Sequence, residues 1–303
     1  MADRIGWVGL GGMGRPMAAN VARAGLELTV CDLRPEPVAE LGGLGAASAE
    51  DAVAVAAAAD VLFVSLPNST VSKQVAAEVF AAASRPSVYV ELSTLSPSVM
   101  RGLAEQAAAA GVGFCDSPVS GNVRARREGT LSVMVGGEVA AFERIRPVLD
   151  AFGGNVFHLG PVGAGSVAKL ANNLIALTSL ATAMEGLLLG ARAGLDFQQL
   201  CEVVMTASGA GPQVLGVAHQ QRTRRYRESA SPQAALRLAV KDLELGVELA
   251  EEVGLPVRTA QAALQTWREA EAAGLAEAEI FALLDHLEAV RTIAPPGFER
   301  TTP

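Results

Sequence analysis

A lysine and an asparagine four residues apart are the first candidates for chemistry in this chain. Lys169 and Asn173 lie in the stretch "GPVGAGSVAKLANN", whose other residues are small, apolar or amide-bearing. On a helix this spacing places both side chains on one face, with Ser166 and Asn172 close by. Burial among such neighbours lowers the pKa of a lysine towards neutrality, where it can act as a general acid and base. The alternative is an ordinary lysine at a helix start that extends its ammonium into water.

A glycine-rich turn near the N-terminus predicts a second kind of site. Gly9, Gly11 and Gly14 follow an apolar stretch and open a helical one in "GWVGLGGMGRPM". The first glycine permits a tight turn, the second lets the backbone approach a pyrophosphate, and the third lets the helix pack on the strand. Asp32 ends the next expected strand, at about the 20-residue distance where an acid accepts hydrogen bonds from a ribose. Together these features predict a bound dinucleotide.

The charges around Asp32 bear on which dinucleotide is bound. A carboxylate at this position repels a 2′-phosphate, which favours NAD over NADP. Arg34 follows closely and could instead bind that phosphate, or it could be a solvated loop residue. We therefore expect NAD, with NADP as the alternative.

The histidines and cysteines predict neither a metal centre nor a nucleophile. His158, His219 and His286 form no Ser/His/Asp or metal-ligand pattern, and His158 is expected to pack at a strand end. The cysteines are far apart in sequence and form no C-x-x-C pattern: Cys31, Cys115 and Cys201. We expect no metal ion and no disulfide, and a reducing cytoplasm.

Alternating strands and helices must position the candidate residues. The β-rich stretches before residue 160 are separated mostly by Ala-rich helical ones, and they are RIGWVG, LELTVCD, DVLFVSLP, SVYVELS, VGFCDSP, LSVMVGG and NVFHLG. This alternation predicts an α/β fold in which a parallel, doubly wound sheet carries helices on both faces. Several stretches are apolar throughout, as strands covered on both faces should be.

After "GPVGAG" the β-rich stretches stop, and the rest is predicted to be helical. The breaks between helices fall at Gly194, Gly209 to Pro212, Ser231–Pro232, Gly254 to Pro256 and Gly274. The first helix should extend from about residue 164 to about residue 193 and join the two domains as the spine of the second. We expect domains at residues 1–162 and 163–292 and a flexible tail at 293–303.

The composition is that of a compact, globular chain long enough for two domains. Half of the 303 residues are hydrophobic and 18% are charged, so the core is built mainly from Ala, Val and Leu. The net charge of -8 argues against a nucleic-acid partner, whose binding needs a basic face. No secretory signal is expected, because a first strand begins almost at once. The apolar stretch from Leu174 to Leu189 carries Glu185 and is short for a membrane span, so we expect a buried core helix and no membrane partner.

Four motifs occur in the order found in one enzyme family: the glycine motif, "SPVSGNVRARREGTLSVMVGG", "GPVGAGSVAKLANN" and "KDLELG". With them the sequence resembles the β-hydroxyacid dehydrogenases, typified by 3-hydroxyisobutyrate dehydrogenase, from about residue 4 to about residue 290. The resemblance implies a Rossmann-like N-terminal domain, an all-helical C-terminal domain and a cleft where NAD(P) meets a small 3-hydroxy acid. It also implies that Lys169 is the catalytic acid/base, that Asn173 orients the substrate oxygen, and that no metal takes part.

The same resemblance assigns the substrate carboxylate to the turn in "DSPVSGN". Ser120, the Gly121 backbone and Asn122 are expected to hold it, and backbone N–H groups in a turn of small residues do bind anions. An ordinary Ser/Gly turn is the alternative. Asn122 departs from the family, which usually has a second glycine there, so its amide either donates to the substrate or narrows the pocket.

The resemblance also covers positions whose residues do not by themselves indicate a reaction. Three arginines stand where the family commonly has small or acidic residues: Arg124, Arg126 and Arg127. A solvated charged loop is expected there, and a site for a second anionic group is the alternative. Lys241 in "KDLELG" matches a second lysine near nicotinamide and substrate, while Asp242 is expected to cap or pair within the helical domain. The matching cofactor-lining positions are Leu10, Gly12, Met13, Leu66, Pro67, Asn68, Val71 and Thr94.

Other functions share this fold. An imine reductase shares this architecture but usually has another residue in place of the lysine, and a non-catalytic dinucleotide-binding module typically loses it, so Lys169 counts against both. A short-chain semialdehyde or glyoxylate reductase on the same fold is a further alternative. A 6-phosphogluconate dehydrogenase is disfavoured, because its helical domain is far longer. Relatives assemble as dimers or tetramers, and the Ala- and Leu-rich helices predict a homodimer or homotetramer.

Overall fold

The structure of the chain is a computed structural model that describes residues 3–223 and 235–290. The expected tail at residues 293–303 and the expected helix break at Ser231–Pro232 lie outside these ranges. The chain forms two compact units, of which the first holds the sheet and the second is helical. Unit 1 comprises Met1–Asn173 and Leu245–Pro256, and unit 2 comprises Leu174–Glu244 and Val257–Pro303.

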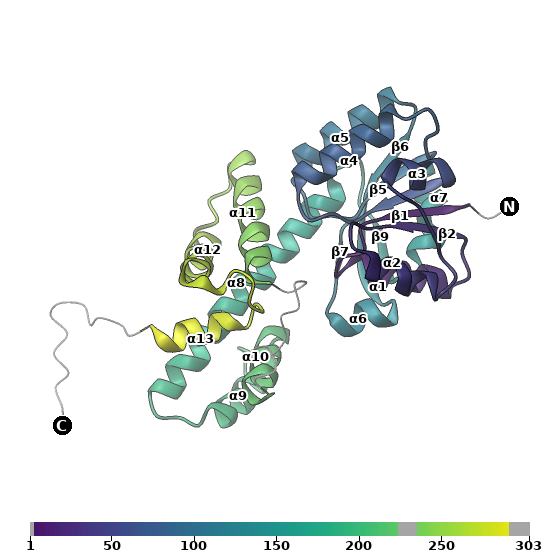
Figure 1. The fold of residues 1–303 in the computed structure, drawn as a ribbon. Coiled ribbons are helices and arrows are strands. Elements are labelled where there is room, and N and C mark those ends of the chain that lie inside the picture. The colour runs from purple at the N-terminus through teal and green to yellow at the C-terminus, as the bar shows by residue number, and fades with distance from the viewer. Residues whose placement is uncertain (1–2, 224–234, 291–303) are drawn as a thin grey trace, which may run out of the picture. The chain divides into compact units, whose positions relative to one another are not determined.

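One mixed sheet forms the centre of unit 1 (Figure 1). Its strands are β1 Ile5–Val8, β2 Leu28–Cys31, β3 Ala47–Ser48, β4 Val61–Val64, β5 Val88–Glu91, β6 Gly113–Asp116, β7 Val119–Ser120, β8 Leu131–Gly137 and β9 Gly153–His158. They follow the order β3-β2-β1-β4-β5-β6-β8-β7, with β9 paired to β8. The direction of strand order reverses between β1 and β4. In doubly wound sheets ligands bind beyond the carboxyl ends of the strands at such a point.

Helices cover both faces of this sheet, as the alternation in the sequence predicts. Alternate residues of each strand supply the two cores, for example Trp7 and Phe63 to one and Tyr89 and Phe114 to the other. The first core is closed by α1 Gly14–Arg23, α2 Pro35–Gly42 and α7 Val139–Leu149. The second is closed by α3 Ala52–Ala58, α4 Ser69–Ala81 and α5 Pro97–Ala109. Figure 1 shows α4 and α5 on one side of the sheet and α1 and α2 on the other.

Every β-rich stretch expected from the sequence is a strand, but the sheet is not parallel throughout. β8 pairs antiparallel with β6 and β7, and only its pairing with β9 is parallel. The two-residue strands β3 and β7 were not expected, because two residues are too few to show a pattern. The short helix α6, Val123–Glu128, follows β7 directly.

The long helix predicted at the junction is confirmed as α8, Ala164–Arg192. It is long and apolar enough to cross a membrane by length and composition alone, which is weak evidence for a span. Contrary to expectation, it is not buried all round. Leu180, Met184 and Leu187 are buried, whereas Ile175 and Leu189 are exposed. The boundary between the two units falls inside this helix.

The remaining helices break close to the glycines and prolines expected from the sequence. They are α9 Phe197–Met205, α10 Pro212–Thr223, α11 Leu236–Glu252, α12 Arg258–Ala270 and α13 Ala282–Ala289. Gly274 interrupts the π-helical segment Glu271–Leu275 with a φ of 91°, which glycine adopts without strain. Trp267 is fully buried and its indole N–H donates to the carbonyl of Leu177 at 3.4 Å, which ties α12 to α8.

Candidate active site

The glycine-rich turn has the geometry that a dinucleotide requires. Gly9 has a φ of 90°, and a Cβ there would collide with the carbonyl of Ser65. A Cβ on Gly14 would collide with the carbonyl of Gly9, so α1 packs directly on the turn. Gly11, in contrast, has nothing within 4 Å of its Cβ position. This open backbone at a helix N-terminus fits a pyrophosphate, so the residues present suit the predicted cofactor.

Asp32 lies beside this turn at the end of β2. Its carboxylate accepts the backbone N–H of Leu10 at 2.6 Å and the guanidinium of Arg34 at 3.0 Å. Burial alone would raise its pKa, but hydrogen bonds from Arg34 and Leu10 outweigh burial and hold the pKa below its usual value. Arg34 also donates to the carbonyl of Leu10 at 3.1 Å, so its side chain lies along the carboxylate.

The other expected cofactor-lining residues lie in the loops after β4 and β5 and on the first turn of α4, and a buried network joins the two loops. The N–H of Leu66 donates to the hydroxyl of Ser93 at 2.7 Å, and the N–H of Ser93 donates to the carboxylate of Glu91 at 3.0 Å. Burial raises the pKa of Glu91 to about 7, although hydrogen bonds from Ser93 oppose it. Asn68 caps α4 by accepting the N–H of Val71 at 3.0 Å. Glu91 was missed from the sequence, where it is only the last residue of an apolar strand.

Lys169 and Asn173 lie on the first turns of α8 within unit 1. Lys169 is half-buried, and Asn173 is 9% exposed. Asn172 donates to the hydroxyl of Ser120 at 3.2 Å and to the side-chain oxygen of Asn173 at 3.1 Å. The structure therefore brings the helix of the candidate acid/base against the turn expected to bind a carboxylate.

Asp116 holds the start of this helix and was not singled out in the sequence. It ends β6, is 0% exposed, and its carboxylate accepts the backbone N–H groups of Gly163 and Ser166, each at 2.7 Å. Burial raises the pKa of Asp116, and these two hydrogen bonds oppose the rise. The available signal was an acid at the end of an apolar strand, immediately before "SPVSGN".

The structure gives Asn122 and the arginines distinct roles. The side-chain oxygen of Asn122 accepts the N–H of Ala125 at 2.9 Å and so caps α6. Arg124 is exposed and pairs with Glu128 at 2.8 Å, as a solvated loop would have it. For Arg126 that expectation is wrong. This arginine is 6% exposed and donates to the carbonyl of Gly12, in the glycine-rich turn, at 3.2 Å.

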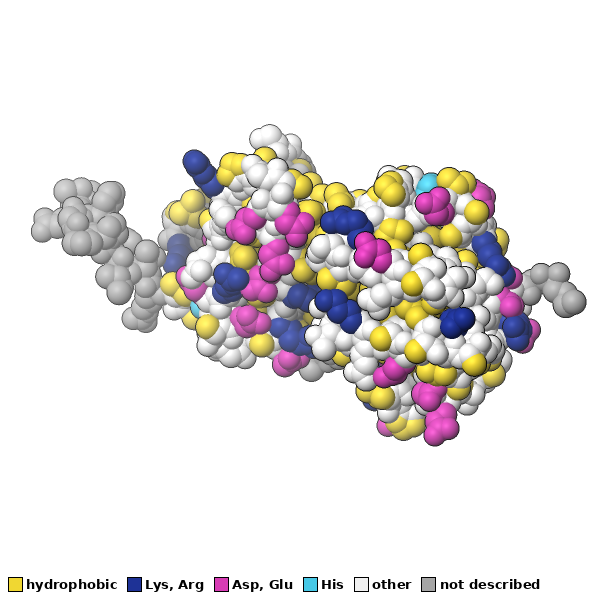
Figure 2. Space-filling view, turned by 90° about the horizontal axis from the view of Figure 1, so that it is seen from above, with side chains coloured by type: hydrophobic (Ala, Val, Ile, Leu, Met, Phe, Trp, Pro, Cys, Tyr) yellow, Lys and Arg dark blue, Asp and Glu magenta, His cyan; other side chains and the backbone are white. Residues whose placement is uncertain are grey.

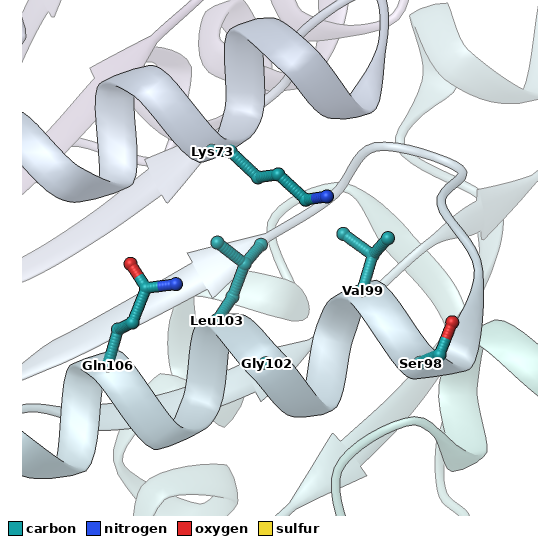
Figure 3. Close-up of a pocket in the computed structure, with 6 residues that line it drawn as sticks. All are labelled: Lys73, Ser98, Val99, Gly102, Leu103 and Gln106. Atoms are coloured by element: carbon teal, nitrogen blue, oxygen red, sulfur yellow. The ribbon is translucent and has the colours of Figure 1, made fainter.

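Two other features are a lysine of the helical unit and a groove in unit 1. Lys241 belongs to unit 2, on α11, where its ammonium pairs with the carboxylate of Asp242 at 3.0 Å. A groove of about 340 Å³ runs between α4 and α5, and Figure 3 shows Lys73 projecting into it from α4. The other lining residues come from α5: Ser98, Val99, Gly102, Leu103 and Gln106. None of the residues expected to act on substrate or cofactor lines this groove.

Family models match almost the whole chain. Residues 4–160 match the NAD-binding domain of 6-phosphogluconate dehydrogenase. Residues 163–287 match a model described as the NAD-binding domain of NADP-dependent 3-hydroxyisobutyrate dehydrogenase.

Individual proteins give the same answer. The 2-(hydroxymethyl)glutarate dehydrogenase of Eubacterium barkeri is 33% identical over 299 residues, 97% of this chain and 98% of that protein. The 3-hydroxyisobutyrate dehydrogenase of Pseudomonas aeruginosa is 41% identical over 208 residues, 68% of this chain and 70% of that protein. The solved structure of Mycobacterium tuberculosis 3-hydroxyisobutyrate dehydrogenase with L-serine superposes with a TM-score of 0.84 at 30% identity, over 95% of this chain and 100% of the other. The chain therefore belongs to the β-hydroxyacid dehydrogenase family of NAD(P)-dependent oxidoreductases.

Proposed function

We propose that the chain catalyses the reversible oxidation of a small 3-hydroxy acid to the corresponding semialdehyde. The observation that carries this proposal is the hydrogen bond from Asn172 to Ser120, which joins the helix of Lys169 to the candidate carboxylate turn. The molecules named for its relatives share a carboxylate and a hydroxymethyl group on one carbon, and they differ in the remaining substituent. A substrate of this class can be held by its carboxylate while its hydroxyl meets the lysine.

The turn at the end of β7 binds the carboxylate in this proposal. The hydroxyl of Ser120 and the backbone N–H of Gly121 face the anion, and the amide nitrogen of Asn122 donates to it while its oxygen caps α6. A Cβ on Gly121 would lie 2.6 Å from the side chain of Leu131, so any other residue here would force that buried side chain to shift. Charge-assisted hydrogen bonds of this kind fix the orientation of the acid.

Lys169 moves the proton. The nicotinamide, when bound, accepts hydride from the carbon that bears the hydroxyl. Neutral Lys169 takes the hydroxyl proton during oxidation, and its ammonium returns a proton to the carbonyl oxygen during reduction. Asn173 orients the substrate oxygen, and its own side-chain oxygen is held by Asn172 at 3.1 Å. Lys241 assists near the nicotinamide and the substrate.

The cofactor in this proposal is NAD in preference to NADP. The glycine-rich turn Gly9, Leu10, Gly11, Gly12, Met13 and Gly14 receives the pyrophosphate, and Asp32 receives the ribose hydroxyls. Arg34 is paired with Asp32 at 3.0 Å, so it neutralises part of the charge that would repel a 2′-phosphate. The rest of the cofactor is lined by Leu66, Pro67 and Asn68 in the loop after β4, by Val71 on α4 and by Thr94 in the loop after β5.

The proposal extends to the whole protein. Residues 1–162 bind the dinucleotide, and residues 163–292 form a helical domain for substrate binding and assembly into a homodimer or homotetramer. The enzyme is soluble and cytoplasmic. On the face drawn in Figure 2 acidic and basic side chains are interspersed, which does not suit a nucleic-acid partner.

A substrate panel tests the proposed activity. Purified protein is supplied with NAD at alkaline pH and with 3-hydroxyisobutyrate, serine or 2-(hydroxymethyl)glutarate, or with 2-hydroxy isomers that are secondary alcohols and can give up hydride, such as 2-hydroxybutyrate. NADH formation is followed, and the reverse reaction is run with the semialdehydes. We expect turnover of 3-hydroxy acids and none of the 2-hydroxy isomers, because the hydroxyl of an isomer lies on the wrong carbon for Lys169. Reduction of cyclic imines without oxidation of any hydroxy acid would replace the proposal with an imine reductase.

A further inference from the structure

The carboxylate of Asp116 joins the end of β6 to the first turn of α8. One of its oxygens accepts the N–H of Gly163 and the other accepts the N–H of Ser166, each at 2.7 Å. The first N–H groups of a helix have no partners within the helix, and a carboxylate interacts favourably with the positive end of the helix dipole. Asp116 thus caps α8 from a strand, 47 and 50 residues earlier in the chain.

The backbone around this carboxylate packs closely on it. A Cβ on Gly136 would collide with Asp116 itself, and a Cβ on Gly165 would collide with the carbonyl of Met134. The start of α8 therefore packs backbone to backbone on β8, with the carboxylate enclosed between them. A buried ion so closely fitted resists displacement, because any movement would leave charge and donors unpaired.

The same short segment contacts α8 a second time. Ser120 follows Asp116 in the chain and accepts the amide of Asn172 at 3.2 Å. Lys169 lies between the two contacts, about 4.5 Å along the helix axis from Ser166. The distance from Lys169 to the carboxylate turn is therefore set from both sides by one stretch of chain.

We propose that Asp116 is a positioning residue for the oxidation, which holds Lys169 at the correct distance from the carboxylate of the hydroxy acid. It acts through the backbone of α8 and does not touch the substrate. This inference rests on the proposed role of Lys169 as acid/base. A displacement of about 1 Å in such a group can lower a rate by about 100-fold.

Asparagine is the sharpest substitution, because it keeps the shape of Asp116 but offers one acceptor in place of two. Its amide nitrogen would face the N–H of Gly163 or Ser166, donor against donor. We expect Asp116→Asn to lower kcat by roughly 10- to 100-fold while the affinity for NADH stays within about twofold. Asp116→Ala should do more, and thermal unfolding identifies any variant that fails to fold.

A double-mutant cycle separates positioning from general loss of structure. If Asp116 acts through Lys169, Asp116→Asn should cost little further activity once Lys169→Ala is present. Asp51 provides a matched control, since its carboxylate caps α3 by accepting the N–H of Ala54 at 2.7 Å. Asp51→Asn should leave kcat unchanged both in the wild type and in the Lys169→Ala background. An equal loss from Asp116→Asn in both backgrounds, or wild-type kcat in a folded variant, would overturn the inference.

Amide hydrogen exchange tests, without any substrate, whether Asp116 holds the start of α8. In Asp116→Asn the amides of residues 163–170 should exchange faster, while those of the glycine-rich turn should not change. Unchanged exchange in residues 163–170 would contradict the inference that Asp116 holds the start of α8. A wild-type protein that oxidises no 3-hydroxy acid contradicts the proposed function instead, so the two failures are distinguishable.

Discussion

Among the described residues of unit 1, two carboxyl groups and one guanidinium are buried beside the loops of the candidate site: Glu91, Asp116 and Arg126. Each meets backbone groups of a different loop, since Glu91 and Asp116 accept N–H groups and Arg126 donates to a carbonyl. A buried charge is costly unless it is hydrogen-bonded, and these bonds are made with the loops that must be fixed. These buried side chains therefore fix the backbone of the loops that form the candidate site.

Lys169 gives the first prediction at this scale. Lys169→Ala should lower kcat by roughly 10²- to 10⁴-fold, because the proton then has no positioned acceptor. NADH affinity should be nearly unchanged, because the pyrophosphate is held by the glycine-rich turn. Lys73→Ala is the matched control, since Lys73 lines only the groove between α4 and α5. Steady-state kinetics and NADH titration measure both effects, and a Lys169→Ala enzyme whose kcat is within threefold of wild type, about 0.65 kcal/mol, refutes the role.

Asp32 and Arg34 give a prediction about the cofactor. NADH should bind more tightly than NADPH, because the Asp32 carboxylate occupies the region of the 2′-phosphate. Asp32→Ser should narrow or reverse that difference, since it removes the repulsion and releases Arg34 from its 3.0 Å ion pair. Arg34→Ala in the Asp32→Ser background should then lower the affinity for NADPH again. Fluorescence titration with both nucleotides measures this. Tighter NADPH binding by the wild type would show that Arg34 prevails over Asp32.

Glu91 gives a prediction about stability and pH. Its pKa is about 7 when folded, against an ordinary value of 4.5, so the folded protein binds the proton more strongly than the unfolded chain. Stability should therefore fall as pH rises from 4.5 to about 7, by about 3 kcal/mol at most, and then level off. Glu91→Gln removes this dependence and should be the more stable protein above pH 7. Urea unfolding of the wild type and of Glu91→Gln at pH 4.5 and above pH 7 tests this prediction. The same pH dependence of stability in both proteins would contradict it.

At the scale of elements, α8 depends on glycine where it meets the sheet. A Cβ on Gly165 would collide with the carbonyl of Met134, whereas Gly102 inside α5 has nothing within 4 Å. Gly165→Ala should cost about 1–3 kcal/mol and shift Lys169 with the helix, so kcat should fall as well. Gly102→Ala should stabilise by up to about 1 kcal/mol, because alanine is the better helix former. Chemical unfolding and kinetics on both variants check the contrast, which equal effects would refute.

The same helix shows what the sequence could and could not predict. Its bounds follow from a long stretch without proline, and the main strands follow from continuous apolar stretches. The partners of Asp116 could not be predicted, because Gly163 and Ser166 are distant in sequence and meet it only once β6 and β8 pair. Arg126 was misjudged for a similar reason. A charged stretch predicts solvent exposure, and only the packing of α6 beside α1 buries this guanidinium.

At the scale of the whole molecule, the sequence predicts a division into a sheet unit and a helical unit. The boundaries between the compact units lie inside α8 and α11, since Asn173 and Leu174 belong to different units, as do Glu244 and Leu245. A helix shared by two units is continuous in sequence pattern, so periodicity contains no signal for that boundary.

Assembly is the last prediction, and the exposed face of α8 carries it. Ile175 and Leu189 are 66% and 72% exposed, and they lie close to four helical turns apart on one side of the helix. The exposed residues between them are mostly uncharged, namely Ser179, Thr182 and Gly186, and Glu185 is the one charged residue beside them. A long stripe with large apolar ends and a single charge favours burial against a second copy of the chain. Light scattering at micromolar concentration should therefore give a multiple of 31.1 kDa. Lys substitutions at Ile175 and Leu189 should shift the mass towards one chain, while the matched substitution of exposed Val139 on α7 should not. A wild-type mass of 31.1 kDa would refute the assembly.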